Sequence, residues 1–416
     1  MSVLRAWLLA ALAGGILGCG MVAAWRAPDV PRTRDVEAIL TEPSAEALAR
    51  RLQPIGIPDI PVRKRLRPCC EFGYGLRLRV GLLPILGYRI GNLRSVDRLG
   101  RHHYDSGFLM IDLDGEKPLV ADENNGLVFT CRGGFVDTAH VRDYTDWAIF
   151  LAAHLYAELD RGTVIDLPDE GGRRRVVLPP VDERLLRKHD RVSLAVGIAQ
   201  GLAFQLSVWH EIATWYGWST MPGFSEQASA FSPEDLYSNL IGTKIAAATA
   251  YERSARSAAL YERSVDAWLR EILRYLGPLP ISTAVEAMKS LDGTWWSSRA
   301  RIPDGDAVMR RNLALGSTLT PWIVPADLAS DALKRDLLRM CGGWPTPLTL
   351  PNPSRVADRP LDSLATLEIR PDRDLLAHPV FARLGRRITQ EAFPALVEEI
   401  GTEVRARFGP RADRPD

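Results

Sequence analysis

Apolar residues recur with a helical period along the second two thirds of the chain. The segment Asp137–Asp160 contains no glycine or proline and stops just before Gly162. Apolar residues spaced three and four positions apart predict a helix with a buried face, and this spacing returns several times. It predicts helices at Asp137–Asp160, Asp182–Tyr216, Pro233–Tyr251, Ser254–Leu276 and Arg386–Phe408, with shorter helices between residues 280 and 340.

Short β-type runs separated by glycine turns occupy residues 66–132 instead. A polar hairpin is predicted for residues 162–180, around the Gly171–Gly172 pair, and residues 342–380 are proline-rich and irregular. Runs of this kind, bounded by turn residues, are typical of strands. They predict strands at Tyr74–Leu83, Phe108–Leu113 and Gly126–Cys131.

These patterns predict an α+β protein in which a small N-terminal sheet region packs on a mainly α-helical core. We expect a core domain over residues 61–340, with a helical bundle from residue 137 onward. Residues 341–416 would add a proline-rich segment and a C-terminal helix packed on that core.

The first residues resemble a bacterial lipoprotein signal. Arg5 precedes the apolar run Trp7–Leu17, which has the length of a signal-peptide core. The run ends in Ile16–Cys19, which resembles a lipobox whose cysteine is lipidated. Residues 1–18 would then be removed, and residues 19–60 would form a tether with one short helix at Ser44–Leu52.

Acyl chains on Cys19 would anchor the protein to a membrane, with its body facing the periplasm. Gly20 follows the cysteine, and the absence of aspartate there favours the outer membrane over the inner one. Two alternatives stay open: a membrane-spanning anchor at Trp7–Ala24, and a plain signal peptide.

Composition and charge exclude several other classes of protein. Apolar residues make up 46% and charged residues 25% of the 416 residues, as in soluble globular proteins and unlike disordered or polytopic membrane chains. The 52 Lys and Arg residues nearly balance the 51 Asp and Glu residues, so the net charge is +1. We therefore expect no nucleic-acid partner.

One predicted helix carries an unusual polar stripe. Ser193–Trp218 contains no lysine or arginine, and its apolar residues cover most of the circumference, so we expect it to be buried. At 100° per residue, its polar groups share an arc of about 100°. They would line a polar cavity: Gln200, Ser207, His210, Glu211 and Thr214.

The preceding helix offers a facing surface. His140 and Asp143 lie three positions apart, so both side chains could point at one location. Asp137 is a natural N-cap for this helix. Arg142 and Asp146 fall on the other side, where we expect solvent.

The helix after the polar stripe begins with Ser232–Asp235, a start signal with proline in the first turn. The acid Asp235 is expected to cap this helix by reaching back toward Ser232. Glu234 and Asn239 remain freer to bind a ligand.

Histidines with carboxylates on separate helices suit a divalent metal such as zinc. We expect His140, Asp143, His210 and Glu234 as ligands. Glu211 would activate water for hydrolysis of an envelope substrate.

The His210–Glu211 pair is similar to the start of a zincin helix, but Thr214 stands where the second histidine would be, so that motif is absent. The alternative is a non-catalytic lipoprotein that binds a partner and whose histidines and acids form a buried hydrogen-bond network.

Cys131 supports a different enzyme hypothesis. The stretch Thr130–Val136 resembles the turn that carries the nucleophilic cysteine of papain-like peptidases, where a helix start activates the thiolate. A structural or disulfide-bonded cysteine is the competing interpretation. Cys69, Cys70, Cys131 and Cys341 allow three pairings in an oxidising compartment, and the sequence selects none.

Four blocks of the sequence resemble an uncharacterised family of predicted bacterial lipoproteins, the domain of unknown function DUF4056. They lie between residues 67 and 239: Arg67–Cys70, Thr130–Asp143, His210–Gly217 and Phe231–Asn239. The resemblance implies an envelope address and one structural unit, and it implies no activity.

Overall fold

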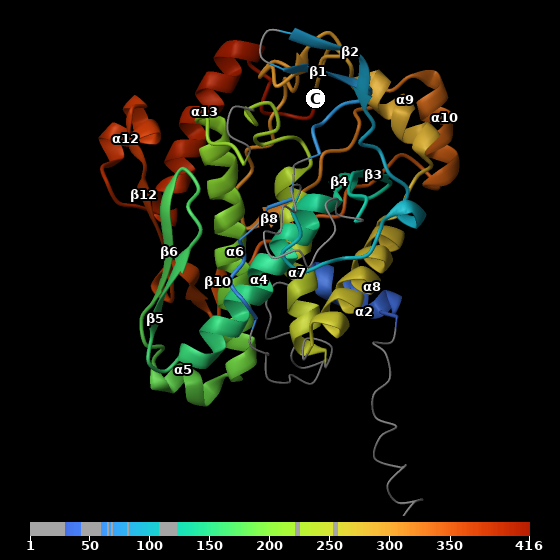
Figure 1. Ribbon diagram of the computed structural model, residues 1–416. Helices are drawn as coiled ribbons and strands as arrows, with labels where there is room; N and C mark the ends of the chain where they lie inside the picture. The colour runs from blue at the N-terminus through green and yellow to red at the C-terminus, as the bar shows by residue number, and fades with distance from the viewer. Residues whose placement is uncertain are drawn as a thin grey trace, which may run out of the picture.

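The computed structural model describes residues 30–42, 60–64, 66–67, 70–80, 83–107, 123–220, 225–252 and 257–416. Its centre is a bundle of three helices that pack against one another (Figure 1). They are α4 (Thr138–Glu158), α6 (Arg191–Trp215) and α7 (Asp235–Tyr251). The predicted α+β class, with a mainly helical core, is confirmed.

Aspartate caps decide where these helices begin. Asp137 accepts a hydrogen bond from Ala139 N, as an N-cap does, so the predicted cap of α4 is confirmed. Asp190 caps α6 through Ser193 N. The prediction of one helix over residues 182–216 is therefore wrong at its N-terminal end. A short helix, α5 (Glu183–Lys188), ends before Asp190 starts a new helix in another direction.

The three core helices are buried almost all round. Every residue of α7 is buried, and so is almost every residue of α6. Among the described helices, α6 is the one long and apolar enough to cross a membrane, yet nearly all of it is covered by protein. Helices α4 and α7 approach so closely that a Cβ on Gly242 would lie 2.3 Å from Val141 O.

A four-stranded antiparallel sheet lies beside α6, in the order β13–β12–β6–β5 (Figure 1). Strands β5 (Thr163–Leu167) and β6 (Gly172–Leu178) form the predicted hairpin. Strands β12 (Thr366–Pro371) and β13 (Ile388–Thr389) come from a region without a clear strand pattern. The C-terminal part of the chain thus completes a sheet begun two hundred residues earlier.

The remaining strands are short. Strands β1 (Leu76–Val80) and β2 (Leu83–Ile90) are antiparallel, and β7 (Arg301–Ile302) pairs with β1 in parallel. The hairpin of β3 (Leu127–Thr130) and β4 (Gly134–Asp137) leads directly into α4. Two further pairs are β8 (Thr318–Leu319) with β9 (Leu350–Pro351), and β10 (Arg355–Val356) with β11 (Arg359–Pro360). The predicted strand Phe108–Leu113 lies outside the described residues.

The other α-helices surround the bundle. On one side lie α8 (Ala258–Leu276), α9 (Ile281–Leu291) and α10 (Asp331–Met340), and near the sheet lie α11 (Arg373–Leu376), α12 (Pro379–Leu384) and α13 (Phe393–Phe408) (Figure 1). Helix α13 begins at Phe393 rather than at the predicted Arg386. The Phe393 ring stacks on Trp209 of α6, with 5.8 Å between ring centroids.

Part of the predicted tether is folded onto the core. Helix α2 (Thr33–Thr41) buries Val36, Ile39 and Leu40 and packs against α7 and α8. Lys244 of α7 donates a hydrogen bond to Glu42 O, just beyond the end of α2, at 3.4 Å. The predicted signal segment, the lipidation site Cys19 and the predicted helix Ser44–Leu52 lie outside the described residues.

Candidate metal centre

The N-terminal turns of α4 and α7 meet the C-terminal turns of α6. This arrangement brings together His140, His210 and Glu211, whose ligand atoms all lie within 4.8 Å of one another. All three side chains are buried, with residue exposures of 1 to 5%. Three residues predicted from separate positions in the sequence therefore converge on one place.

The ring of His210 is held from behind by a carboxylate. Its Nδ1 hydrogen bonds to Glu170, and Arg174 binds the other oxygen of the same carboxylate. Burial alone would lower the pKa of His210, but Glu170 outweighs it and raises the pKa to about 9. Metal-binding histidines usually have such a carboxylate on the ring nitrogen that does not bind the metal.

A partly exposed tryptophan packs against the cluster. Trp218 is half-buried and packs edge-on against His210, with 5.7 Å between ring centroids. The ring of His140 is also edge-on to the His210 ring, with 6.2 Å between ring centroids.

Glu211 is fixed through one oxygen. Its Oε2 accepts a hydrogen bond from Phe231 N at 2.7 Å, while Oε1 is buried and has no hydrogen-bond partner among the described residues. Phe231 adopts φ of 55°, which costs a non-glycine residue on the order of 1–3 kcal/mol. The strained backbone thus holds Glu211 with one oxygen available.

Asp235 has two roles at the start of α7. Its Oδ2 accepts a hydrogen bond from Ser232 N at 2.6 Å, so the predicted capping role is confirmed. Its Oδ1 lies 3.6 Å from His140 Nδ1. Together with Asp137, these two residues form a second group of potential ligands, again within 4.8 Å of one another.

Glu234 lies next to these groups without belonging to either. It is 2% exposed, and neither carboxylate oxygen has a hydrogen-bond partner among the described residues. Burial, followed by repulsion from neighbouring carboxylates, raises the pKa of Glu234 and of Asp235 well above the ordinary values. We call the six residues the His/acid cluster: Asp137, His140, His210, Glu211, Glu234 and Asp235.

Asp143 does not join this cluster, so the prediction that it shares a location with His140 is wrong. Its Oδ1 accepts hydrogen bonds from Arg63 at 2.6 Å and from Arg67 at 2.8 Å, and its Oδ2 accepts one from Arg67 N. Two arginines from an N-terminal segment bind the carboxylate, and nothing in the sequence of α4 indicates their approach.

The other face of α4 is also buried, which corrects the expectation of solvent there. Arg142 and Asp146 are both 0% exposed. Asp146 pairs with Arg67 at 3.0 Å and with His102 Nε2 at 2.9 Å. The sequence analysis expected solvent around Arg142 and Asp146. Instead, charged residues from other segments cover this face of α4 and pair with its charged side chains.

Cys131 forms a disulfide bond with Cys341. Its sulfur is therefore not a free thiol in this structure, which does not support the papain-like alternative. Cys70 is a free cysteine, and its backbone N donates a hydrogen bond to Asp137 Oδ2 at 3.0 Å.

Within the described residues, the rest of the polar stripe on α6 joins neither group of potential ligands. Gln200 donates a hydrogen bond to Thr243 O, and Ser207 donates one to Phe204 O, a carbonyl of its own helix. Only His210 and Glu211 of the five predicted residues belong to the cluster. The helical wheel placed them correctly by direction, but it carries no information about position along the axis.

Three members of the site had no ligand role in the sequence analysis. Asp137 and Asp235 were interpreted as caps, and their second role depends on the meeting of α4 and α7. Glu170 lies in the β5–β6 hairpin, forty residues from His210. An acid in a polar hairpin gives no signal that a buried histidine lies opposite.

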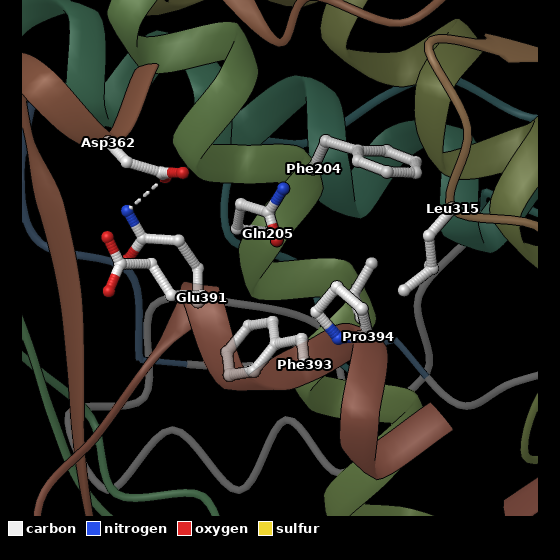
Figure 2. A pocket seen from close by; sticks show the side chains of 9 residues that line it. Phe204, Gln205, Leu315, Asp362, Glu391, Phe393 and Pro394 are labelled. Carbon is white, nitrogen blue, oxygen red and sulfur yellow. Dashed lines mark hydrogen bonds between the residues drawn. The ribbon is translucent and has the colours of Figure 1, made fainter. Parts of the chain in front are cut away.

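A separate surface pocket of about 300 Å³ lies between α6 and the start of α13 (Figure 2). It contains two carboxylates, Asp362 and Glu391. Gln390 Nε2 donates a hydrogen bond to Asp362 Oδ1 at 2.8 Å. No histidine, cysteine or lysine is among its lining residues. The His/acid cluster is therefore the better candidate for a metal-binding or catalytic site.

A family model described as "Protein of unknown function (DUF4056)" matches residues 57–325. The chain belongs to this family. The match contains all four blocks noted in the sequence and every member of the DUF4056 protein's His/acid cluster. No curated protein and no solved structure matches the chain.

Proposed function

We propose that this DUF4056 protein is a metal-dependent hydrolase of the bacterial cell envelope. The observation that carries the proposal is the convergence of His140, His210 and Glu211 within 4.8 Å of one another. Two imidazoles with a carboxylate are a common set of protein groups around catalytic zinc.

Each residue has a specific part in this proposal. His140 and His210 would hold the ion, and Glu170 fixes the orientation of the His210 ring through Nδ1. A divalent ion held there would supply the acidity that lowers the pKa of water to about 7. Glu211 is held through Oε2 by Phe231 N, and its Oε1, which has no hydrogen-bond partner among the described residues, would accept the proton.

The envelope address rests on the lipobox-like sequence at Cys19. The disulfide between Cys131 and Cys341 supports it, because such bonds persist in oxidising compartments. The burial of α6 inside the protein also supports a folded body outside the bilayer. We propose that the lipidated protein faces the periplasm and acts on peptidoglycan, lipid or peptide.

The alternative is a non-catalytic lipoprotein in which the cluster is a structural hydrogen-bond network. The depth of burial favours this alternative, as does the satisfied chain from His210 through Glu170 to Arg174. The unpartnered oxygens of Glu211 and Glu234 favour the metal instead, because buried polar groups without partners are costly.

The deciding experiment measures bound metal. The protein would be purified in detergent, stripped with a chelator, reloaded with Zn²⁺ and analysed by mass spectrometry. We expect at least one equivalent, with one equivalent fewer in His210→Ala and no change in His154→Ala. His154 is a matched control, because this α4 histidine contacts Phe150 O away from the cluster. Less than ~0.1 equivalent in the unmodified protein overturns the proposal.

A second variant tests catalysis. Glu211→Gln keeps the shape and the acceptor oxygen for Phe231 N but removes the base. We expect it to retain zinc and to lose about 10²- to 10⁴-fold in the release of dye from labelled peptidoglycan. If His210→Ala loses stability while metal binding is unchanged, the structural alternative is correct.

A further inference from the structure

The potential ligands of the His/acid cluster form two overlapping groups rather than one. The first group is His140, His210 and Glu211, and the second is Asp137, His140 and Asp235. His140 belongs to both, and each of its two ring nitrogens is able to bind a cation once that nitrogen carries no proton. Its Nδ1 lies toward the second group, 3.6 Å from Asp235 Oδ1.

Helix capping accounts for only part of the second group. Asp137 accepts hydrogen bonds from Ala139 N and Cys70 N, and Asp235 Oδ2 accepts one from Ser232 N. Each carboxylate oxygen has more than one lone pair. The contact of Asp235 Oδ1 with His140 is not needed to cap α7, so capping does not explain this contact.

The buried side chain of Glu234 is a second observation, independent of the two groups, that points to a cation. Its side chain is buried, and both of its carboxylate oxygens lack a hydrogen-bond partner among the described residues. It interacts electrostatically with the carboxylates of Asp137, Glu71 and Glu211. A buried carboxylate surrounded by other carboxylates requires a proton or a cation to compensate its charge.

The carboxylates of the cluster carry more charge when ionised than one ion compensates. Asp235 interacts electrostatically with the other three carboxylates, Asp137, Glu211 and Glu234. Among the described cations nearby, Arg174 is bound to Glu170, and Arg311 interacts with Glu211 and Asp235 but directs its hydrogen bonds to the backbone oxygens of Ala228 and Ala230. When all four carboxylates are ionised, one divalent ion compensates two of their charges and two ions compensate all four.

We propose that the cluster binds two divalent cations. The first would be held by His140 and His210, with Glu211 beside it as the base, and the second by Asp137, His140 and Asp235, with Glu234 as a further carboxylate for it. His140 would bridge the two ions as an imidazolate, and its ring proton would be released to solvent when the ions bind. This inference rests on the proposed function and extends it to a two-metal hydrolase, in which one ion activates water and the other stabilises the charge that develops on the substrate. The imidazole-rich group suits Zn²⁺, and the carboxylate-rich group suits Mn²⁺ or Zn²⁺.

The test is the metal stoichiometry of the detergent-purified protein, titrated with Zn²⁺ and with Mn²⁺ after chelation. We expect two equivalents in the unmodified protein and one in Asp235→Asn, since asparagine still accepts the hydrogen bond from Ser232 N. His210→Ala should also retain one equivalent, and Asp362→Asn in the surface pocket is the control that keeps two. Glu234→Gln, which preserves the side-chain shape, should weaken the second ion about 10-fold or more.

The outcomes separate this inference from the proposed function. No bound metal overturns both. One equivalent, retained in Asp235→Asn and lost in His210→Ala, overturns the second ion and leaves the proposed function standing. Two equivalents that persist in Asp235→Asn and in Glu234→Gln overturn the assignment of the second ion to these carboxylates.

Discussion

The buried arginine Arg67 offers the sharpest test of what holds the N-terminal segment to α4. Its guanidinium group pairs with Glu123 at 2.6 Å, Asp143 at 2.8 Å and Asp146 at 3.0 Å, and it donates to His103 O at 2.7 Å. The change Arg67→Met keeps much of the side-chain volume and removes the charge.

The expected loss follows from the burial of the partners. The side chains of Arg67 and its three carboxylate partners are 0 to 5% exposed. Removing one member of a buried ion pair costs about 3–5 kcal/mol. This is a large part of the 5–15 kcal/mol by which native proteins are typically stable.

The pH dependence has a definite sign. Burial alone would raise the pKa values of Glu123 and Asp146. Arg67 outweighs burial and lowers the pKa of Glu123 well below its ordinary value, and His102 together with Arg67 does the same for Asp146. Their contribution to stability is therefore present above the unfolded pKa of about 4 and is lost as the pH falls below it. The deficit of Arg67→Met should be greatest near neutral pH and should shrink in acid.

The assay is urea unfolding followed by circular dichroism between pH 3 and 7. The matched control is Arg161→Met, because Arg161 pairs with Glu158 at the surface with 68% of its side chain exposed, and it should change stability by less than about 0.5 kcal/mol. A loss below about 1 kcal/mol at pH 7 in Arg67→Met, or a loss independent of pH, would refute the reasoning.

Three further predictions concern the fold. Cys341→Ser should cost about 2–5 kcal/mol in the free energy of unfolding by opening a bond across 210 residues, and unchanged stability would argue against the bond. Gly242→Ala should cost about 1–3 kcal/mol, because its Cβ would meet Val141 O; Gly91→Ala, with nothing within 4 Å of its Cβ, is the control that should cost little. Burial lowers the pKa of Lys244 to about 7, and the opposing effect of the Glu42 carboxylate is smaller. In the unfolded chain the pKa is about 10.4, so folding at pH 6 must bury a charged lysine or remove its proton. Lys244→Met should therefore be more stable than the unmodified protein at pH 6, by up to about 4 kcal/mol, and this gain should vanish near pH 10. Equal urea unfolding curves of the two proteins at pH 6 would contradict this.

Local signals predicted much of the helical core. The caps Asp137 and Asp235, the glycine-free run of α4 and the apolar circumference of α6 all depend on residues close in sequence. The break at Asp190 was missed because a capping aspartate and a helical aspartate look alike within a periodic run. The C-terminal strands were missed because they are short and are stabilised by pairing with β6.

For the site, the sequence indicated which residues of α6 and α4 are unusual: a helical stretch, residues 193–218, that has no lysine or arginine and carries His210 and Glu211, and a second helix that carries His140. Their direction around each helix follows from the 3.6-residue period. Only the tertiary structure decided which side chains meet, since contacts between helices depend on axial position and close approach. In the structure Asp143 binds two arginines, Asp235 contacts His140, and Glu170 hydrogen bonds to His210. Glu170, Asp235 and the two arginines lie 40 to 95 residues along the chain from the side chains that they contact, and local periodicity contains no information about such distant partners.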